Sequence, residues 1–253
     1  MGPLTLGAVV FLCVLGGALF GMYLGRVLPQ HHLSDDAKDV IKLSMAMVAT
    51  MAALVLGLMT SSAKSSLDGK ENELRGTAAQ VILLDRTLAL YGIETREARD
   101  LLKRLVAARM SQLWPEENAD GVAPEAIGVD SGIGLLQQQI LGLSPQNDAQ
   151  RWFQSTALQI SRDIAATQWS TFQQVGSQIH WQFLVVVLFW LTIVFASFGL
   201  FAPQNAIAVA ALSVAALAVA GAIYLILAMD QPYGGLIKIS SAPVRAALDQ
   251  LGR

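Results

Sequence analysis

The sequence predicts an all-α polytopic membrane protein with four transmembrane helices and a cytoplasmic helical domain. Hydrophobic residues occupy 54% of the 253 positions and charged residues only 14%, a balance outside that of ordinary soluble domains. Much of the apolar content is gathered in long uncharged runs, which a bilayer accepts as helices because helices satisfy their own backbone hydrogen bonds. Most of the polar residues fall in one long connection, residues 61–180.

Four segments reach the length of about 20 apolar residues that a helix needs to cross a bilayer. The first covers residues 4–28 and the second covers residues 41–60. The first has no basic residues in front of it and is too long for a cleaved signal peptide, so we expect it to be retained. The third and fourth, 183–201 and 206–229, are uncharged and closely spaced, which predicts an antiparallel hairpin.

An even number of spans places both termini on the same face as the long connection. Basic residues near the membrane boundaries are more numerous on this face, where they are Lys64, Lys70, Arg75, Arg162, Lys238 and Arg245. The opposite face has Arg26, Lys38 and Lys42. By the positive-inside tendency, the large face and both termini are cytoplasmic.

These spans divide the chain into four parts. They are a first transmembrane hairpin (1–60), a cytoplasmic helical domain (61–180), a second transmembrane hairpin (181–230) and a cytoplasmic tail (231–253).

Within the cytoplasmic domain, apolar periodicity predicts two antiparallel helices. The first has its apolar stripe from Leu74 onward and ends at Gly92, while the second is capped by Thr95 and stops before Pro115. Residues 116–134 are acidic and aperiodic and predict an exposed loop.

A later helix is expected to begin at the Ser144–Pro145 pair and to continue without a break into the third span. In the tail, Ser240 and Ser241 are candidate caps of a short final helix over residues 243–251.

Several classes of function lack support in the sequence. The formal net charge of −2 offers no basic excess for phosphates, so we expect no nucleic acid partner. Cys13 is the only cysteine, and the adjacent His31 and His32 have no further metal-binding side chain nearby. We therefore expect no metal site and no cofactor. No catalytic arrangement of residues appears, so an enzyme is the least supported class.

One stripe on the second span is a candidate pore lining. Its members are small or weakly polar residues at helical spacing with a lysine at either end: Lys42, Ala46, Ala49, Ala53, Gly57, Thr60 and Lys64. A ring of such helices would have a wide lumen and two collars of positive potential, which favour anions. Asp35, Asp36 and Asp39 at the outer mouth would instead favour cations. The alternative interpretation is that small residues only allow helices to approach closely.

Two other groups of residues are candidates for structural or functional roles. Gly17, Gly21 and Gly25 repeat at every fourth position of the first span, a pattern typical of close helix packing. Asp230 ends the fourth span, where the helix dipole disfavours a carboxylate. A cation such as Lys238, Arg245 or Lys64 is expected to balance it. The alternative is a proton or ion site at Asp230.

Three stretches resemble a known family. Residues 60–109, 195–205 and 229–248 are similar to the start of the cytoplasmic region, the third-span exit and the tail of the bestrophin-like membrane proteins, a group of uncharacterised function. The tail is the most specific part, because composition alone would not produce its motif. The motif residues are Asp230, Pro232, Gly234 and Ile239.

The resemblance implies kinship with bestrophins, which are pentameric ion channels with four spans per subunit and a cytosolic helical domain. It therefore implies a homo-oligomer, with a pentamer as the first expectation, that conducts small ions across a bacterial inner (plasma) membrane. The second span departs from bestrophins, whose pore neck is lined by bulky apolar residues. A non-conducting membrane scaffold or sensor, whose cytoplasmic helices bind a partner, is the alternative.

Overall fold

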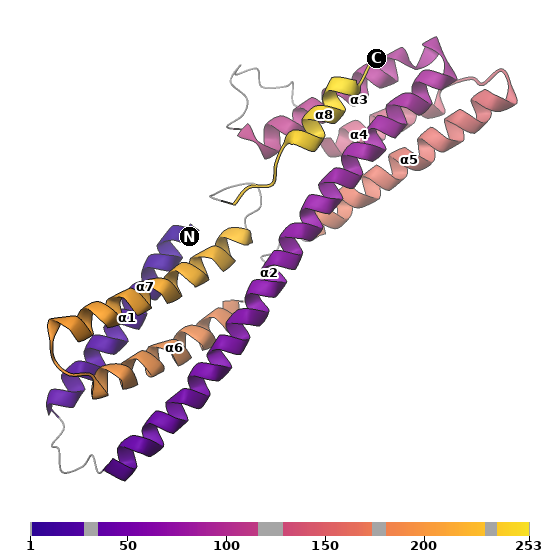
Figure 1. Ribbon diagram of the computed structural model, residues 1–253. Coiled ribbons are helices and arrows are strands. Elements are labelled where there is room, and N and C mark those ends of the chain that lie inside the picture. Colours follow the sequence, from indigo (N-terminus) through magenta and orange to yellow (C-terminus); the bar gives the residue numbers. More distant parts are fainter. Residues whose placement is uncertain (1, 28–34, 116–128, 174–180, 231–236, 253) are drawn as a thin grey trace. The chain divides into compact units, whose positions relative to one another are not determined.

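The computed structural model describes residues 2–27, 35–115, 129–173, 181–230 and 237–252, and these residues contain helices and no strand (Figure 1). The elements are α1 (Pro3–Val27), α2 (Asp35–Tyr91), the short 3-10 helix η2 (Ile93–Thr95), α3 (Arg96–Leu113), α4 (Val129–Leu141), α5 (Asp148–Gln173), α6 (Trp181–Phe201), α7 (Ala206–Met229) and α8 (Ala242–Gln250). Helices α1, α2, α6 and α7 are long and apolar enough to cross a membrane. The predicted fold class is confirmed.

The chain divides into two compact units. The membrane unit comprises Met1–Leu67 and Ser177–Ile237, and the polar unit comprises Asp68–Gly176 and Lys238–Arg253. Helix α2 contributes its first part to the membrane unit and its second part to the polar unit.

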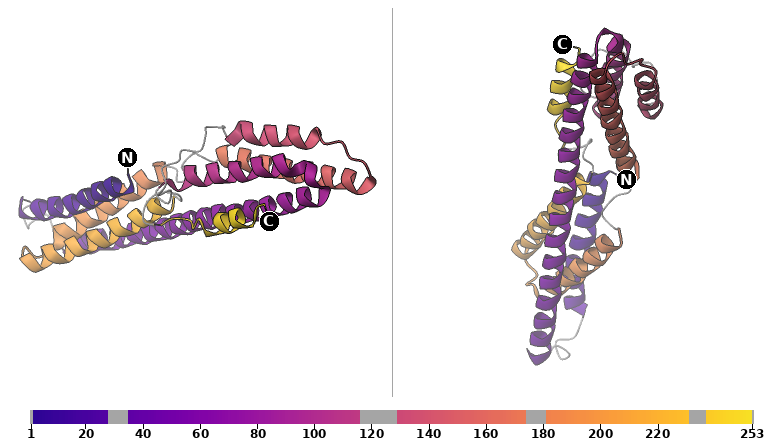
Figure 2. Two further views of the ribbon diagram at one scale, coloured as in Figure 1. Left: turned by 90° about the horizontal axis from the view of Figure 1, so that it is seen from above. Right: turned by 90° about the vertical axis from the view of Figure 1, so that its right-hand side faces the viewer.

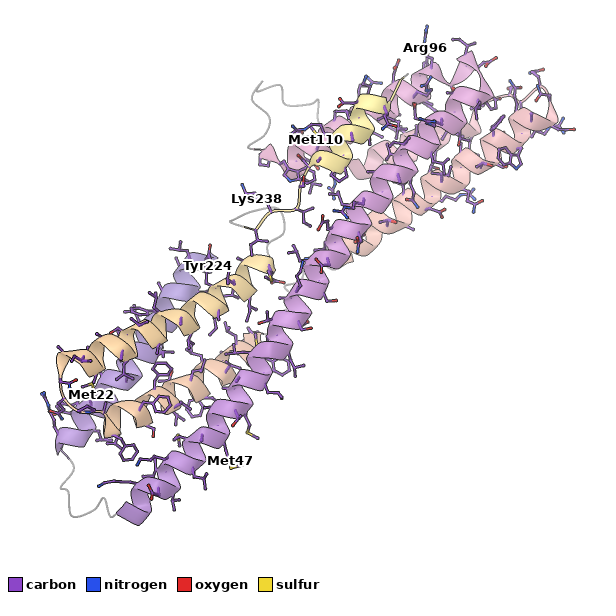
Figure 3. The ribbon with its side chains drawn as sticks, in the orientation of Figure 1. Met22, Met47, Arg96, Met110, Tyr224 and Lys238 are labelled. Atoms are coloured by element: carbon purple, nitrogen blue, oxygen red, sulfur yellow. The ribbon has the colours of Figure 1, made fainter. Side chains whose placement is uncertain are left out.

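In the membrane unit, α1 packs against both α6 and α7 (Figure 1). The start of α1 lies beside the end of α7, where a Cβ at Gly7 would be 3.4 Å from the Cβ of Tyr224, a residue labelled in Figure 3. The shared core is made of aliphatic and aromatic side chains from four helices. Its buried members include Val10, Val14, Ala18, Ala52, Val187, Leu191, Phe195, Ala216, Ala220 and Ile223.

In the polar unit, α3 packs against α4 and α8, and α4 packs against α5 (Figure 2). Leucine and isoleucine side chains from α2, α3, α4 and α5 fill its centre. The most buried are Leu84, Leu88, Leu101, Leu102, Leu136 and Ile140. Leu251, after α8, belongs to the same core.

The side chains of two glutamines hold the ends of the polar-unit helices together. Gln150 donates to the backbone oxygen of Tyr91 at 3.1 Å, at the end of α2. Gln154 donates to the backbone oxygens of Ile140, in the last turn of α4, and of Leu143, just beyond it, at 2.8 and 3.0 Å. These bonds satisfy carbonyl groups that a helix end leaves without intrahelical partners.

Two expectations about where helices begin and end were wrong. The second span and the first helix of the polar unit are one continuous helix, because α2 continues to Tyr91 through a polar stretch that contains no proline. Where this helix leaves the membrane stays a prediction. The loop expected over 116–134 gives way to α4 from Val129 onward. There Gly132 permits close packing rather than a turn, since a Cβ on it would overlap the side chain of Leu105.

One helix start and one capping bond also differ from the expected ones. Helix α5 begins at Asp148, with the Asn147 side chain accepting from the Gln150 amide at 2.8 Å, rather than at Ser144. Thr95 occupies the cap position of α3, but its side chain accepts no capping bond. Its single hydroxyl hydrogen points back toward the Leu88 and Gly92 oxygens, at 2.6 and 2.8 Å from the hydroxyl oxygen. The expected continuity of α5 into the third span involves residues 174–180, which lie outside the described residues.

Ser240 and Ser241 differ in their contacts at the start of α8. The Ala242 amide donates to the Ser240 hydroxyl at 3.2 Å, whereas Ser241 occupies the cap position without accepting a capping bond. The helix itself lies where the sequence predicts one, within about a residue at each end.

Candidate functional site

Helix α2 presents three faces in the membrane unit. The packing face contributes Ala52, Val55, Leu56 and Met59 to the core shared with the other spans. A second, large apolar face is exposed, and Met47 of this face is labelled in Figure 3. The members of the large apolar face are Val40, Leu43, Met47, Met51, Leu54 and Leu58.

The predicted lining stripe forms the third face, which we call the small face. Successive residues of a helix are rotated by about 100° about the helix axis, so Ala53 points away from both Ala52 and Leu54. Ala46, Ala53, Gly57 and Thr60 are exposed, and Ala49 is half-buried. A Cβ at Gly57 would meet no other atom within 4 Å. The chain's own described helices therefore leave most of this face uncovered.

The lysines at the two ends of the small face are both exposed. Lys42 lies 3.5 Å from a carboxylate oxygen of Asp39, and its ammonium group is 6.0 Å from the ring centroid of Phe201 on α6. Asp39 thus offsets part of the positive charge at this end. Cation–π attraction to Phe201 holds the ammonium toward α6.

Thr60 of the small face, and Thr50 beside it, add little polarity. Thr60 donates its hydroxyl hydrogen to the Leu56 oxygen at 2.8 Å, and Thr50 donates in the same way to the Ala46 oxygen. Their oxygens still have lone pairs that can accept hydrogen bonds. The face therefore offers acceptors and small apolar groups, with a cation at each end.

The three glycines of α1 lie on its contact with α6. Cβ atoms at Gly17 and Gly25 would be 2.8 Å from the backbone oxygens of Thr192 and Leu200. At Gly21 a Cβ would overlap the backbone oxygen of Ala196. Since residues 17, 21 and 25 meet 192, 196 and 200 in the same order, α1 and α6 run parallel.

An arginine and a glutamine join the ends of these helices. Arg26 donates from Nε to the side-chain oxygen of Gln204, in the link between α6 and α7. Gln204 in turn donates to the Met22 oxygen at 3.4 Å. From the sequence alone, Arg26 is only a charge that flanks the first span. Its partner lies 178 positions away, and no local pattern marks such a pair.

The structure describes only some residues of the tail motif. Asp230 ends α7 and is half-buried, with no ion pair found to another described residue. Pro232 and Gly234 lie outside the described residues. Lys238 and Arg245 are exposed and belong to the polar unit. The balancing cation of Asp230 stays a prediction.

Replacing Asp230 by asparagine tests the two interpretations of this carboxylate. If a cation balances the charge, the substitution removes a charge-assisted contact, and the melting temperature of the purified protein falls by a few degrees. If Asp230 is instead a proton or ion site, stability stays unchanged and transport changes. Asp249→Asn, on the exposed side of α8, is the control.

The polar unit contains a buried ion pair that sequence analysis missed. Arg99 of α3 donates from Nε and from a terminal nitrogen to the two oxygens of Asp85 on α2, at 2.8 and 2.9 Å. The side chains are 20% and 5% exposed. The hydrogen bonds to Asp85 raise the pKa of Arg99. A two-point contact between charged groups fixes the angle between helices as well as their separation.

No three His, Cys, Asp or Glu side chains come together as a metal-binding group in the part of the chain that the structure describes. His31 and His32 are outside that part.

Four long apolar helices with mutual packing, together with a polar helical bundle, define a polytopic α-helical membrane protein. A family model for the bestrophin-like domain matches residues 12–244 of the chain. The chain therefore belongs to the bestrophin-like family, and the resemblance found in the sequence is confirmed. Neither the comparison with curated proteins nor that with solved structures gives a match.

Proposed function

We propose that the protein is the subunit of a homo-oligomeric pore that conducts small ions across a bacterial inner membrane. The uncovered small face of α2 is the observation that supports this most strongly. The large apolar face on the same helix suits lipid, whereas alanine, glycine and threonine expose backbone and offer lipid few contacts. A closed ring of subunits with small faces inward gives these residues an aqueous lining.

Four spans per chain are few for a pathway within one subunit. The packing of α1 against α6 and α7 is tight, with glycine contacts between backbones. This packing leaves α2 at one side as the span with the most exposed surface. A pore assembled between subunits uses that surface, and bestrophin kinship makes a pentamer the first expectation.

The charges at the two ends of the proposed pore lining influence which ions the pore conducts. Lys42 and Lys64 supply positive potential at the two ends of the lining, which favours anions. The contact between Lys42 and Asp39 weakens the collar at one end. We therefore propose modest anion preference rather than strict selection.

A scaffold that binds a partner through the polar unit is the second candidate. Large apolar side chains stand exposed on that unit, at Leu83, Leu90, Ile93 and Trp152. Water does not favour such exposure, and partner proteins commonly cover residues of this kind. In this case the protein would carry no current.

Symmetry and flux together test the pore. Purified protein in nanodiscs is expected to form closed rings, and the same protein in liposomes is expected to release trapped chloride. A monomeric particle with no flux above empty liposomes would contradict the proposal and favour the scaffold.

Lys42→Glu tests whether the small face faces the ions. In a ring, this change replaces one cation per subunit by an anion, so the ratio of chloride to sodium permeability is expected to fall by about tenfold, corresponding to about 1.4 kcal/mol. Reversal potentials under a salt gradient measure the ratio. Lys70→Glu, in the polar unit, is the control. Equal ratios in wild type and Lys42→Glu would remove Lys42 from the pathway.

A further inference from the structure

The last part of the chain completes the polar unit, although the segments that form most of this unit come before the third span. Residues Lys238–Arg253, which we call the tail strap, belong to this unit. Helix α8 of the strap packs on α3 (Figures 1 and 2). Two spans, α6 and α7, separate the strap from the segments that it joins.

A buried hydrogen bond holds the beginning of the strap. The indole nitrogen of Trp114, just after α3, donates to the backbone oxygen of Ile239 at 3.0 Å. Both residues are buried. A buried carbonyl or indole N–H without its partner is costly, so this bond favours the docked strap.

A second polar contact holds the end of the strap. The amide of Gly252 donates at 3.3 Å to an oxygen of Asp85, the carboxylate that also binds Arg99. The strap thus reaches the ion pair that joins α2 to α3. Its end contributes to the geometry of the same charged site.

Apolar side chains fill the space between the two polar contacts. Ala247 and Leu251 are buried, and Leu248 packs against the core of the polar unit. Without the strap, the pocket for Leu251 and the Trp114 indole would be open to water. The two polar contacts and the three apolar side chains therefore all favour the docked strap.

We propose that docking of the tail strap acts as a lock on the membrane topology of the chain, that is, on the number of times the chain crosses the membrane. The strap can dock on α3 only when the chain, after leaving α5, has crossed the membrane an even number of times. Its docking therefore excludes molecules in which only one of α6 and α7 has inserted, and in such molecules the polar unit cannot reach its closed form. The proposal is independent of ion conduction.

Thiol labelling of the full-length protein tests docking. In a Cys13→Ser background, Leu251→Cys places a thiol in the buried pocket, and Ala246→Cys places one on the exposed side of α8. A soluble maleimide is expected to react with Leu251→Cys at least tenfold more slowly than with Ala246→Cys. Equal rates would overturn the proposal.

Trp114→Phe tests the hydrogen bond while keeping an aromatic ring. Loss of one buried hydrogen bond shifts the opening equilibrium by about tenfold, so the labelling of Leu251→Cys should accelerate by that factor. Ala246→Cys should label at the same rate with either residue at 114. An unchanged Leu251→Cys rate would overturn the role of this bond.

The side of the membrane from which each thiol can be labelled tests this lock. Arg96, exposed on α3 and labelled in Figure 3, can carry a reporter thiol as Arg96→Cys. In sealed vesicles of one orientation, an impermeant maleimide is expected to reach Arg96→Cys and Ala246→Cys from the same side. Labelling from opposite sides would overturn the lock. Neither readout uses flux, so failure here is distinct from failure of the pore.

Discussion

Replacing Gly21 by alanine is expected to push α1 away from α6 and to destabilise the membrane unit by about 3 kcal/mol or more. The added Cβ would overlap the backbone oxygen of Ala196, and a backbone cannot move aside as a flexible side chain can. Thermal unfolding in detergent, followed by circular dichroism or by a dye that reports exposed apolar surface, measures the loss.

Gly16→Ala is the matched control for Gly21→Ala. It makes the same chemical change on the same helix, but its Cβ would meet nothing within 4 Å. Stability is expected to stay within about 1 kcal/mol of wild type. Gly199→Ala, whose Cβ would overlap the Ala18 oxygen from the other side, should behave like Gly21→Ala. If Gly21→Ala melts like Gly16→Ala, the parallel packing of α1 on α6 is wrong.

Asp85→Asn is expected to cost the polar unit about 3 kcal/mol, because it leaves the Arg99 guanidinium largely enclosed without its countercharge. The asparagine also presents one oxygen where the carboxylate presents two, so the Gly252 amide and Arg99 compete for it. Chemical denaturation followed by tryptophan fluorescence can measure the change, since Trp114 lies in the same unit.

An exposed ion pair on α2 provides the control for Asp85→Asn. Arg75 and Glu71 are 2.6 Å apart, but their side chains are 60% and 34% exposed, so Glu71→Gln should cost well under about 1 kcal/mol. Replacing Asp85 and Arg99 together by leucine and methionine should cost less than Asp85→Asn alone, since no charge is left unbalanced. A double replacement that is more harmful than the single one would contradict this account of the pair.

The spans could be predicted from the sequence because lipid imposes one strong requirement, long uncharged helical segments. The third and fourth spans match α6 and α7 closely. The ends of α2 could not be predicted in the same way. Its polar stretch after Thr60 lacks the apolar periodicity that signals a helix, although nothing in it breaks one.

The polar unit was less predictable because long-range contacts decide its details. Helix α4 contains two glycines near its start that indicate a loop when only neighbours are considered, and one of them, Gly132, faces Leu105. The Asp85–Arg99 pair and the Trp114–Ile239 bond join positions 14 and 125 residues apart. No spacing rule connects such positions.

For the candidate pore, helical periodicity alone identified the small stripe from Lys42 to Lys64. It could not distinguish this stripe from the packing face, because both contain alanine. The structure separates them, with Ala52 fully buried against the other spans and Ala53 exposed. The structure does not describe residues 177–180 and 231–236, which adjoin two of the span ends in the sequence.

The accessibility of single cysteines along α2 tests the pore most directly. In a Cys13→Ser background, a small charged thiol reagent added to protein in liposomes is expected to modify Ala49→Cys, Ala53→Cys and Gly57→Cys and to change the flux. The same reagent should leave Ala52→Cys on the packing face and Leu54→Cys on the large apolar face unmodified. Modification of Leu54→Cys together with protection of Ala53→Cys would contradict a lumen lined by the small face.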